Sequence, residues 1–186
     1  VNNTYKNTLQ YEDEWNTLSE KVKKMGINNS LLIAYMPTAT TSIICGQSEC
    51  FLPRTSNLYT HRTLSGCHLV FNPHLINELK FHNLLNAYVI QDIINNGGSV
   101  QFLLTYYKEG HKKYDIIKRI CSIYKTAYEI DPLNVIKIAK SMAPFIDQSI
   151  SMTLSFPSID LSHVLTCLVA SWYSGLKTGS YYIRTK

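Results

Sequence analysis

The sequence predicts an α/β fold, a sheet or barrel in which helices and short strands alternate along the chain. Three observations support this expectation. Apolar residues recur at helical spacing in several segments, apolar runs of strand length separate these segments, and no internal repeat or domain linker interrupts the alternation. We therefore expect residues 1–186 to form a single domain, or part of one, with its working residues at the carboxyl ends of strands.

The first half of the chain is expected to hold a helix, a central strand and then further helices. Helical spacing relates Trp15, Leu18, Val22 and Met25, and Gly26 follows them as a C-cap. The segments after that helix are a strand at 30–35, the start of a short helix after residue 41, a loop at 51–61, a strand at 68–72 and one or two helices within 74–95.

The second half repeats the alternation after a turn at residues 95–98. Its expected elements are a short strand or extended segment at 100–104, a helix at 112–128, a helix from Pro132 to about Met142, a strand at 152–156, a helix at 161–172 that Gly175 caps, and a strand at 180–184. The helix at 161–172 is expected to bury a stripe formed by Leu161, Val164, Leu165, Leu168, Val169 and Trp172.

The composition is that of a globular chain without a strong functional bias. With 186 residues, 45% of them hydrophobic and 17% charged, the chain is long enough to bury a core. The 18 Lys and Arg residues outnumber the 13 Asp and Glu residues, but they are spread along the sequence, so solvated helix faces explain them better than DNA binding. No apolar run approaches the roughly 20 residues that span a bilayer, so we expect no membrane partner.

The five cysteines favour a reducing compartment, and we expect a cytoplasmic protein. Their number is odd and no CxxC pair occurs, which argues against a disulfide framework and a zinc site. Cys45 and Cys50 could be redox-active, but the commoner role of such residues is that of small buried hydrophobes. The six histidines are scattered, so no metal site is expected. Because Val1 begins neither a signal peptide nor a chain with an initiator methionine, we expect a fragment or a processed chain.

Residues 30–41 have the clearest chemical character in the chain. Pro37 stops the apolar run, because proline has no N–H to donate, and a small, hydroxyl-rich segment follows before the next apolar residues. Backbone N–H groups at the start of a helix, with hydroxyl groups beside them, suit an anion and above all a phosphate. Local chemistry leaves a second explanation open, because Ser and Thr clusters cap helices in most proteins for structural reasons.

The adjacent residues Tyr181 and Tyr182 are the second unusual feature. Neighbours on a strand point to opposite faces, so one ring is expected to face a core and the other something else. Good β-propensity and packing explain such a pair in most proteins. The functional alternative is a stacked pair that passes a radical, since tyrosine can lose an electron and a proton together and ring contact keeps the transfer short.

Sequence-local catalytic motifs such as GxSxG, HExxH, a Walker loop and GxGxxG do not occur. Instead, five motifs in order resemble the large, catalytic subunit of class I ribonucleotide reductase. They are WNTLSEKVKKMGINNSLLIAYMPTATT, ECFLPRTSNLYTHRTLSG, NPHLINEL, APFIDQSISM and GLKTGSYYIRT, and the resemblance runs from about Tyr11 to Lys186. It implies the C-terminal part of a ten-stranded α/β barrel and the reduction of ribonucleoside diphosphates to 2′-deoxyribonucleoside diphosphates by thiyl-radical chemistry.

The resemblance also implies roles for two groups of residues. The segment that binds the substrate diphosphate in this family corresponds here to Pro37, Thr38, Ala39, Thr40 and Thr41. The family's paired tyrosines, which relay a radical from the small subunit toward the active-site cysteine, correspond to Tyr181 and Tyr182. In this family the thiyl-forming cysteine and its dithiol pair lie upstream and the dithiol-regenerating tail lies downstream, so the segment alone is expected to be inactive.

The partners that the resemblance implies are a ribonucleoside diphosphate substrate, a ribonucleotide reductase small subunit, a second large subunit in a homodimer, and a thioredoxin or glutaredoxin type reductant. No cofactor is expected in this chain; the family implies ATP and dNTP effectors on upstream segments and a metal-radical cofactor in the small subunit. Departures from the family pattern, among them Asn28, Tyr35 and Cys45, leave an alternative open. This alternative is a catalytically lapsed homologue that acts as a scaffold or interaction protein.

Overall fold

The computed structural model describes residues 11–186, which fall into two compact units divided between Ile33 and Ala34. The first unit contains the helix α1 (Glu12–Met25), and acidic residues in its first turn and basic residues in its last turn complement the helix dipole. Gly26 ends this helix with φ 77° and an N–H that donates to the Val22 carbonyl at 2.8 Å. The predicted helix and its glycine C-cap are therefore confirmed.

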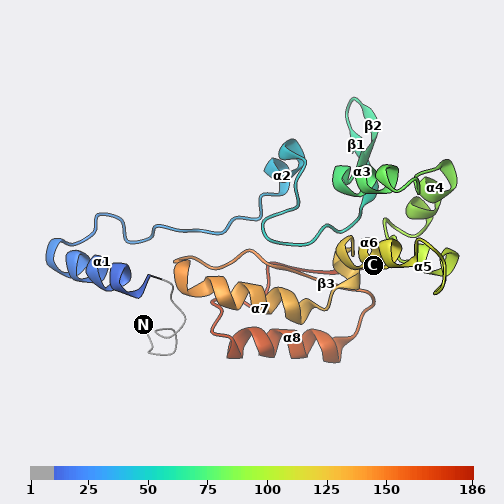
Figure 1. The fold of residues 1–186 in the computed structure, drawn as a ribbon. Coiled ribbons are helices and arrows are strands. Elements are labelled where there is room, and N and C mark those ends of the chain that lie inside the picture. Colours follow the sequence, from blue (N-terminus) through green and yellow to red (C-terminus); the bar gives the residue numbers. More distant parts are fainter. Residues whose placement is uncertain (1–10) are drawn as a thin grey trace. The chain divides into compact units, whose positions relative to one another are not determined.

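The second unit holds all the remaining elements (Figure 1). In chain order they are α2 (Ala39–Cys45), β1 (Leu58–Thr63), β2 (Gly66–Phe71), α3 (Pro73–Phe81), α4 (Ala87–Asn95), α5 (Leu103–Tyr106), α6 (Tyr114–Ile123), α7 (Pro132–Met142), β3 (Thr153–Phe156), α8 (Leu161–Tyr173) and β4 (Tyr182–Thr185). Short 3₁₀ turns lie at Ala127–Glu129 and Ala143–Phe145.

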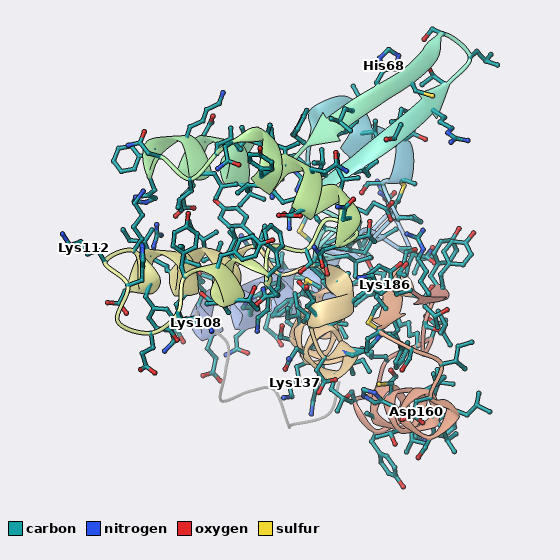
Figure 2. The ribbon with its side chains drawn as sticks, turned by 90° about the vertical axis from the view of Figure 1, so that its right-hand side faces the viewer. His68, Lys108, Lys112, Lys137, Asp160 and Lys186 are labelled. Atoms are coloured by element: carbon teal, nitrogen blue, oxygen red, sulfur yellow. The ribbon has the colours of Figure 1, made fainter. Side chains whose placement is uncertain are left out.

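The strands form two separate two-stranded sheets. β1 and β2 pair antiparallel from Leu58 opposite Phe71 to Thr63 opposite Gly66, and Figure 2 shows His68 on this hairpin. β3 and β4 pair parallel, and α8 connects them, so β3, α8 and β4 make one βαβ unit. This parallel pairing confirms the α/β class, whereas residues 11–186 contain no closed barrel.

Several helices begin where their capping residues predict. The side chains of Asn72, Asn86, Asp131 and Asp160 accept hydrogen bonds from backbone N–H groups in the first turns of α3, α4, α7 and α8, respectively. Figure 2 labels Asp160 at the start of α8. Such caps depend on neighbours only a few residues away, so these helix starts follow from local sequence.

Two apolar clusters are buried in the second unit. One joins β1 with α3, α4, α5 and α6 through Leu58, Leu75, Leu79, Ile93, Leu103, Ile117 and Ile120. The other joins α7, β3 and α8 through Val135, Ile136, Ala139, Met152, Leu154, Phe156 and Cys167. The four residues of β3 are all buried, so this strand is the centre of the second cluster.

The structure overturns the predicted strand at residues 30–35. Only Tyr35 pairs, in a single parallel bridge with Ile150, and the Ser151 N–H donates to the Tyr35 carbonyl at 3.3 Å. Residues 30–34 belong to neither of the two sheets that residues 11–186 form. The apolar run thus correctly predicted extended pairing at its end, at Tyr35, but not a strand over residues 30–35.

Three other boundaries differ from prediction. The expected loop at 51–61 ends earlier, because β1 begins at Leu58. The short strand or extended segment expected at 100–104 is instead followed by α5 from Leu103, whose side chain is buried in the first cluster. The helix expected to reach residue 128 stops at Ile123, because the next carbonyl, that of Tyr124, accepts from the side chain of Asn57 at 2.8 Å.

The helix α8 is where predicted, but its buried face is different. Leu161, Leu165 and Trp172, which were expected to face inward, are exposed, and the fully buried positions are Cys167 and Ser171. The Ser171 hydroxyl donates within the helix to the Cys167 carbonyl at 2.9 Å. Apolar residues surround most of this helix, so periodicity alone could not select the inward face. No helix between residues 11 and 186 has the length and apolarity needed to cross a membrane.

Candidate functional site

An open cleft of about 570 Å³ brings the two groups of predicted site residues together. Residues 36–41, which lead into α2, line it together with Tyr181, Tyr182 and Arg184 from the last strand. Its other lining residues are Glu49, Leu52, Ser151 and Thr153. All seven residues singled out by sequence therefore face one space, although the two groups lie far apart in the chain.

Residues 150–153 explain how these distant segments meet. Ile150 bridges to Tyr35 just before the Pro37 turn, and Thr153 pairs with Tyr182 at the start of β4. The Tyr181 N–H donates to the Met152 carbonyl at 2.6 Å and fixes the chain between them. The tyrosines consequently lie at the beginning of their strand, so the general expectation of a site at carboxyl ends is wrong for them.

Pro37 and Thr38 turn the chain into α2, and Ala39, Thr40 and Thr41 form the first residues of that helix. Thr38 occupies the N-cap position with φ 54°, and its side chain makes no cap hydrogen bond to the helix. Its hydroxyl instead accepts from the Cys50 N–H at 2.8 Å. Structural capping by the Thr38 side chain is therefore contradicted. The first-turn N–H groups of a helix have no partner within the helix, and the start of α2 lines the cleft. The hydroxyls of Thr40 and Thr41 line the same cleft.

The Tyr181 and Tyr182 rings contact each other at the opposite part of the cleft lining. Their centroids are 4.2 Å apart with an interplanar angle of 55°, and each side chain is 51% exposed. Hydrogen bonding between the two hydroxyls, with the electrostatic influence of Tyr182 as the second cause, raises the pKa of Tyr181. The expectation of rings on opposite faces is wrong, because Tyr181 precedes the paired residues of β4 and escapes strand alternation.

Arg184 is a cleft residue that sequence reasoning missed. It is half-buried, and its guanidinium carbon lies 5.8 Å from the centroid of the Tyr182 ring. It is the one basic side chain among the cleft-lining residues. The available signal was its spacing, since residues two apart on a strand point to the same face.

Arg54 and Arg62 are not among the residues that line the cleft. The Arg54 guanidinium donates to the Gly46 carbonyl at 2.7 Å and so holds the end of α2, in a smaller cavity of about 200 Å³ beside the cleft. Arg62 lies on the exposed hairpin. Among residues 11–186 no three His, Cys, Asp or Glu side chains gather as a metal site would require.

The cysteines separate into two groups. Cys121 and Cys167 are buried, as expected of small hydrophobes, and burial raises the pKa of both thiols, that of Cys121 to about 11. Cys50 is half-buried, and burial also raises its pKa. Cys45 is exposed, so the expectation that it is buried is wrong. A raised pKa disfavours the reactive thiolate, which leaves Cys50, Cys121 and Cys167 poorly suited to nucleophilic chemistry.

Comparison with known proteins gives concordant matches. The family described as ribonucleotide reductase, barrel domain, matches residues 2–182. The ribonucleoside-diphosphate reductase large chain of Cryptosporidium parvum is 40% identical over 173 residues, which cover 93% of this chain and 20% of that protein. The corresponding large subunit of African swine fever virus is 45% identical over 157 residues, covering 84% of this chain and 19% of the relative.

A solved structure agrees with these sequence matches. The alpha subunit of a class Id ribonucleotide reductase from Actinobacillus ureae superposes with a TM-score of 0.68 and 27% identity, over 90% of this chain and 28% of that one. The chain spans about a fifth of the length of the curated relatives. The family match over nearly all residues, together with the shared fold, shows that this chain belongs to the ribonucleotide reductase family, as part of its barrel domain.

Proposed function

We propose that this chain is the substrate-diphosphate and radical-relay part of a ribonucleoside-diphosphate reductase large subunit. The complete subunit reduces ribonucleoside diphosphates to 2′-deoxyribonucleoside diphosphates by thiyl-radical chemistry. One observation carries the proposal: residues 37–41 and the Tyr181–Tyr182 pair line the same cleft. A scaffold or interaction protein, the alternative, has no use for an anion-binding turn beside a contacting tyrosine pair.

The start of α2 supplies the groups that a diphosphate needs. The first-turn N–H groups point out of the helix and carry its partial positive charge. The hydroxyls of Thr40 and Thr41 add donors that adjust to the phosphate oxygens. Thr38 is already bonded to the Cys50 N–H, so it shapes the turn and retains its own O–H for donation.

The tyrosine pair supplies the relay. In one step a tyrosyl oxygen gains a hydrogen atom from the neighbouring hydroxyl, so that one O–H bond forms as the other breaks and the radical changes rings. The ring centroids, 4.2 Å apart, keep this transfer short. A tyrosine phenol is protonated at neutral pH, and the raised pKa of Tyr181 acts in the same direction, so the proton is present to move with the electron.

The partners follow from the same proposal. The radical originates on the metal-radical cofactor of a small subunit and passes through Tyr181 and Tyr182 toward a cysteine elsewhere in the large subunit. The large subunit forms a homodimer, takes ATP and dNTP effectors on other segments, receives electrons from a thioredoxin or glutaredoxin type reductant, and works in the cytoplasm.

The experiment is CDP reduction by the full-length large subunit, supplied with its small subunit, a dithiol and ATP. Tyr181→Phe and Tyr182→Phe remove only the O–H bond that the relay uses, so dCDP formation is expected to fall to background. The CDP dissociation constant, measured by equilibrium binding, is expected to change less than about twofold. Tyr88→Phe is the matched control, because Tyr88 is exposed on α4 and lies outside the cleft lining.

Three outcomes separate the hypotheses. Formation of dCDP by wild type and Tyr88→Phe, but by neither relay variant, supports the enzyme and the relay together. Normal turnover by Tyr181→Phe or Tyr182→Phe would refute the relay role. CDP binding without any dCDP from wild type would favour the catalytically lapsed homologue instead.

A further inference from the structure

Arg184 is a cation with no charged partner among residues 11–186. Within residues 11–186, no carboxylate lies within ion-pair distance of its guanidinium. Glu49 also lines the cleft but forms no ion pair with it. A half-buried guanidinium carries a desolvation cost, so a side chain retained in this position needs another interaction to offset it.

The strand β4 places the Arg184 guanidinium near the aromatic ring of Tyr182. Arg184 pairs through its backbone with Ser155 on the buried strand β3, which fixes its Cα in register. Tyr182 lies two residues earlier and so projects from the same face. The guanidinium carbon lies 5.8 Å from the Tyr182 ring centroid, within the range at which a cation is attracted to an aromatic face.

Tyr182 needs such a contact if it is to act in a relay. Half of its side chain is exposed to solvent, and an exposed aromatic ring exchanges between rotamers on a fast timescale. Tyr181 contacts the ring, and Arg184 is a second neighbour whose planar guanidinium suits an aromatic ring. The Tyr182 ring therefore has both a phenol and a cation as neighbours.

We propose that Arg184 is a positioning residue of the radical relay, whose guanidinium holds the Tyr182 ring against Tyr181. This inference rests on the proposed function and adds a residue to it. Arg184 takes no part in the hydrogen-atom transfer itself. Without the Arg184 guanidinium, the Tyr182 ring spends more time out of contact with Tyr181, so the relay slows while residues 37–41 keep their structure.

The kinetic test uses the full-length large subunit with its small subunit and compares Arg184→Gln with Arg184→Lys. Arg184→Gln is expected to lower kcat about fivefold or more and to leave the CDP dissociation constant within about twofold. Arg184→Lys keeps the positive charge and is expected to recover part of the lost kcat. A higher CDP dissociation constant with unchanged kcat would indicate that Arg184 binds phosphate and would overturn the proposal. Unchanged values of both kcat and the dissociation constant would also overturn it.

A second measurement reports the ring without turnover. With 3-fluorotyrosine at position 182, the wild-type ¹⁹F resonance is expected to be shifted from that of the free amino acid. Arg184→Gln is expected to move it toward the free value and to narrow it, because the ring gains motion. Fluorotyrosine at position 88, on the exposed side of α4, is the control and is expected to be insensitive to Arg184→Gln.

The two measurements separate the possible failures. An unchanged fluorine resonance at position 182 in Arg184→Gln would overturn the positioning role even if Tyr182→Phe is inactive. A shifted resonance together with full turnover by Tyr182→Phe would show that the contact exists but that the relay does not, and the positioning role would fall with the proposed function.

Discussion

Thr38, at the start of α2, and Cys50, which contacts it, adopt a backbone conformation that is rare outside glycine. Thr38 has φ 54° and Cys50 has φ 52°, and the Cys50 N–H donates to the Thr38 hydroxyl at 2.8 Å. For a β-branched residue this conformation costs about 1–3 kcal/mol. The Ser42 N–H also donates to the Thr38 carbonyl at 2.8 Å, so the surrounding turn holds the strained residue from both sides.

Thr38→Val tests this clamp, because it keeps the branched shape and removes the acceptor of the Cys50 N–H. We expect the free energy of unfolding to fall by about 1 kcal/mol and the CDP dissociation constant to rise about tenfold as the start of α2 loses its position. Urea unfolding and equilibrium CDP binding measure the two effects. Thr38→Ser keeps the hydroxyl and is the control. Equal CDP binding by wild type and Thr38→Val would contradict the clamp.

At the scale of elements, one buried side chain joins the hairpin to three helices. Asn57 lies just before β1, is 3% exposed, and donates to the Gly98 carbonyl after α4 at 3.0 Å and to the Tyr124 carbonyl after α6 at 2.8 Å. Its own side-chain oxygen accepts from Asn72, the cap of α3, at 2.9 Å. Buried polar groups that are fully bonded fix geometry, so this junction sets where the elements meet.

Gly98→Ala is expected to disrupt the junction. Gly98 has φ +85°, and an added Cβ would lie 1.8 Å from Ser56 Oγ and 2.8 Å from the Asn57 backbone nitrogen. We expect a loss of about 3 kcal/mol or more in the free energy of unfolding. Gly110→Ala is the matched control, since its φ is +93° but nothing lies within 4 Å of the added atom. It should cost only about 1 kcal/mol, and equal losses for both variants in denaturant titrations would rule out crowding as the cause.

The elements differ in how far sequence could predict them. The starts of α3, α4, α7 and α8 follow from caps within a few residues. The sequence placed α7 and α8 correctly and left open whether residues 74–95 form one helix or two, which the structure resolves as α3 and α4. The prediction of a strand at residues 30–35 was wrong because a strand is defined by its pairing partner, and the residue that pairs with Tyr35, Ile150, lies more than a hundred residues away. The prediction of which face of α8 is buried was wrong because that helix is apolar on nearly all sides. Likewise, the seven site residues could be named from motifs, whereas Arg184 required the register of β4 against β3.

At the scale of the whole molecule, a large apolar surface remains uncovered in the described residues. Large side chains that are exposed on the second unit include Ile44, Leu64, Phe81, Trp172 and Tyr173. The sheets have only two strands each, so their outer edges carry unpaired backbone groups. Exposed apolar patches and free strand edges both favour self-association.

Residues 1–186 expressed alone are therefore expected to aggregate, and to reduce no CDP. Size-exclusion chromatography with light scattering measures the association state, and the full-length subunit is the control. A monomer with a sharp, reversible thermal transition would contradict this expectation, because it would show that the segment buries enough surface to be stable by itself.

The single bridge between Tyr35 and Ile150 has a consequence for how the protein reaches its native state. The first buried cluster is drawn from residues 58–124, so its contacts can form early from nearby segments. The cleft has no such local precursor, because its two walls are joined through residues 150–153, which bridge to Tyr35 on one side and pair with Tyr182 on the other. Closing the long loop between Tyr35 and Ile150 costs chain entropy before the contacts that it allows can stabilise the chain. The cleft is thus expected to be among the last regions of this segment to order during folding, and a nascent chain gains it only once β4 has emerged.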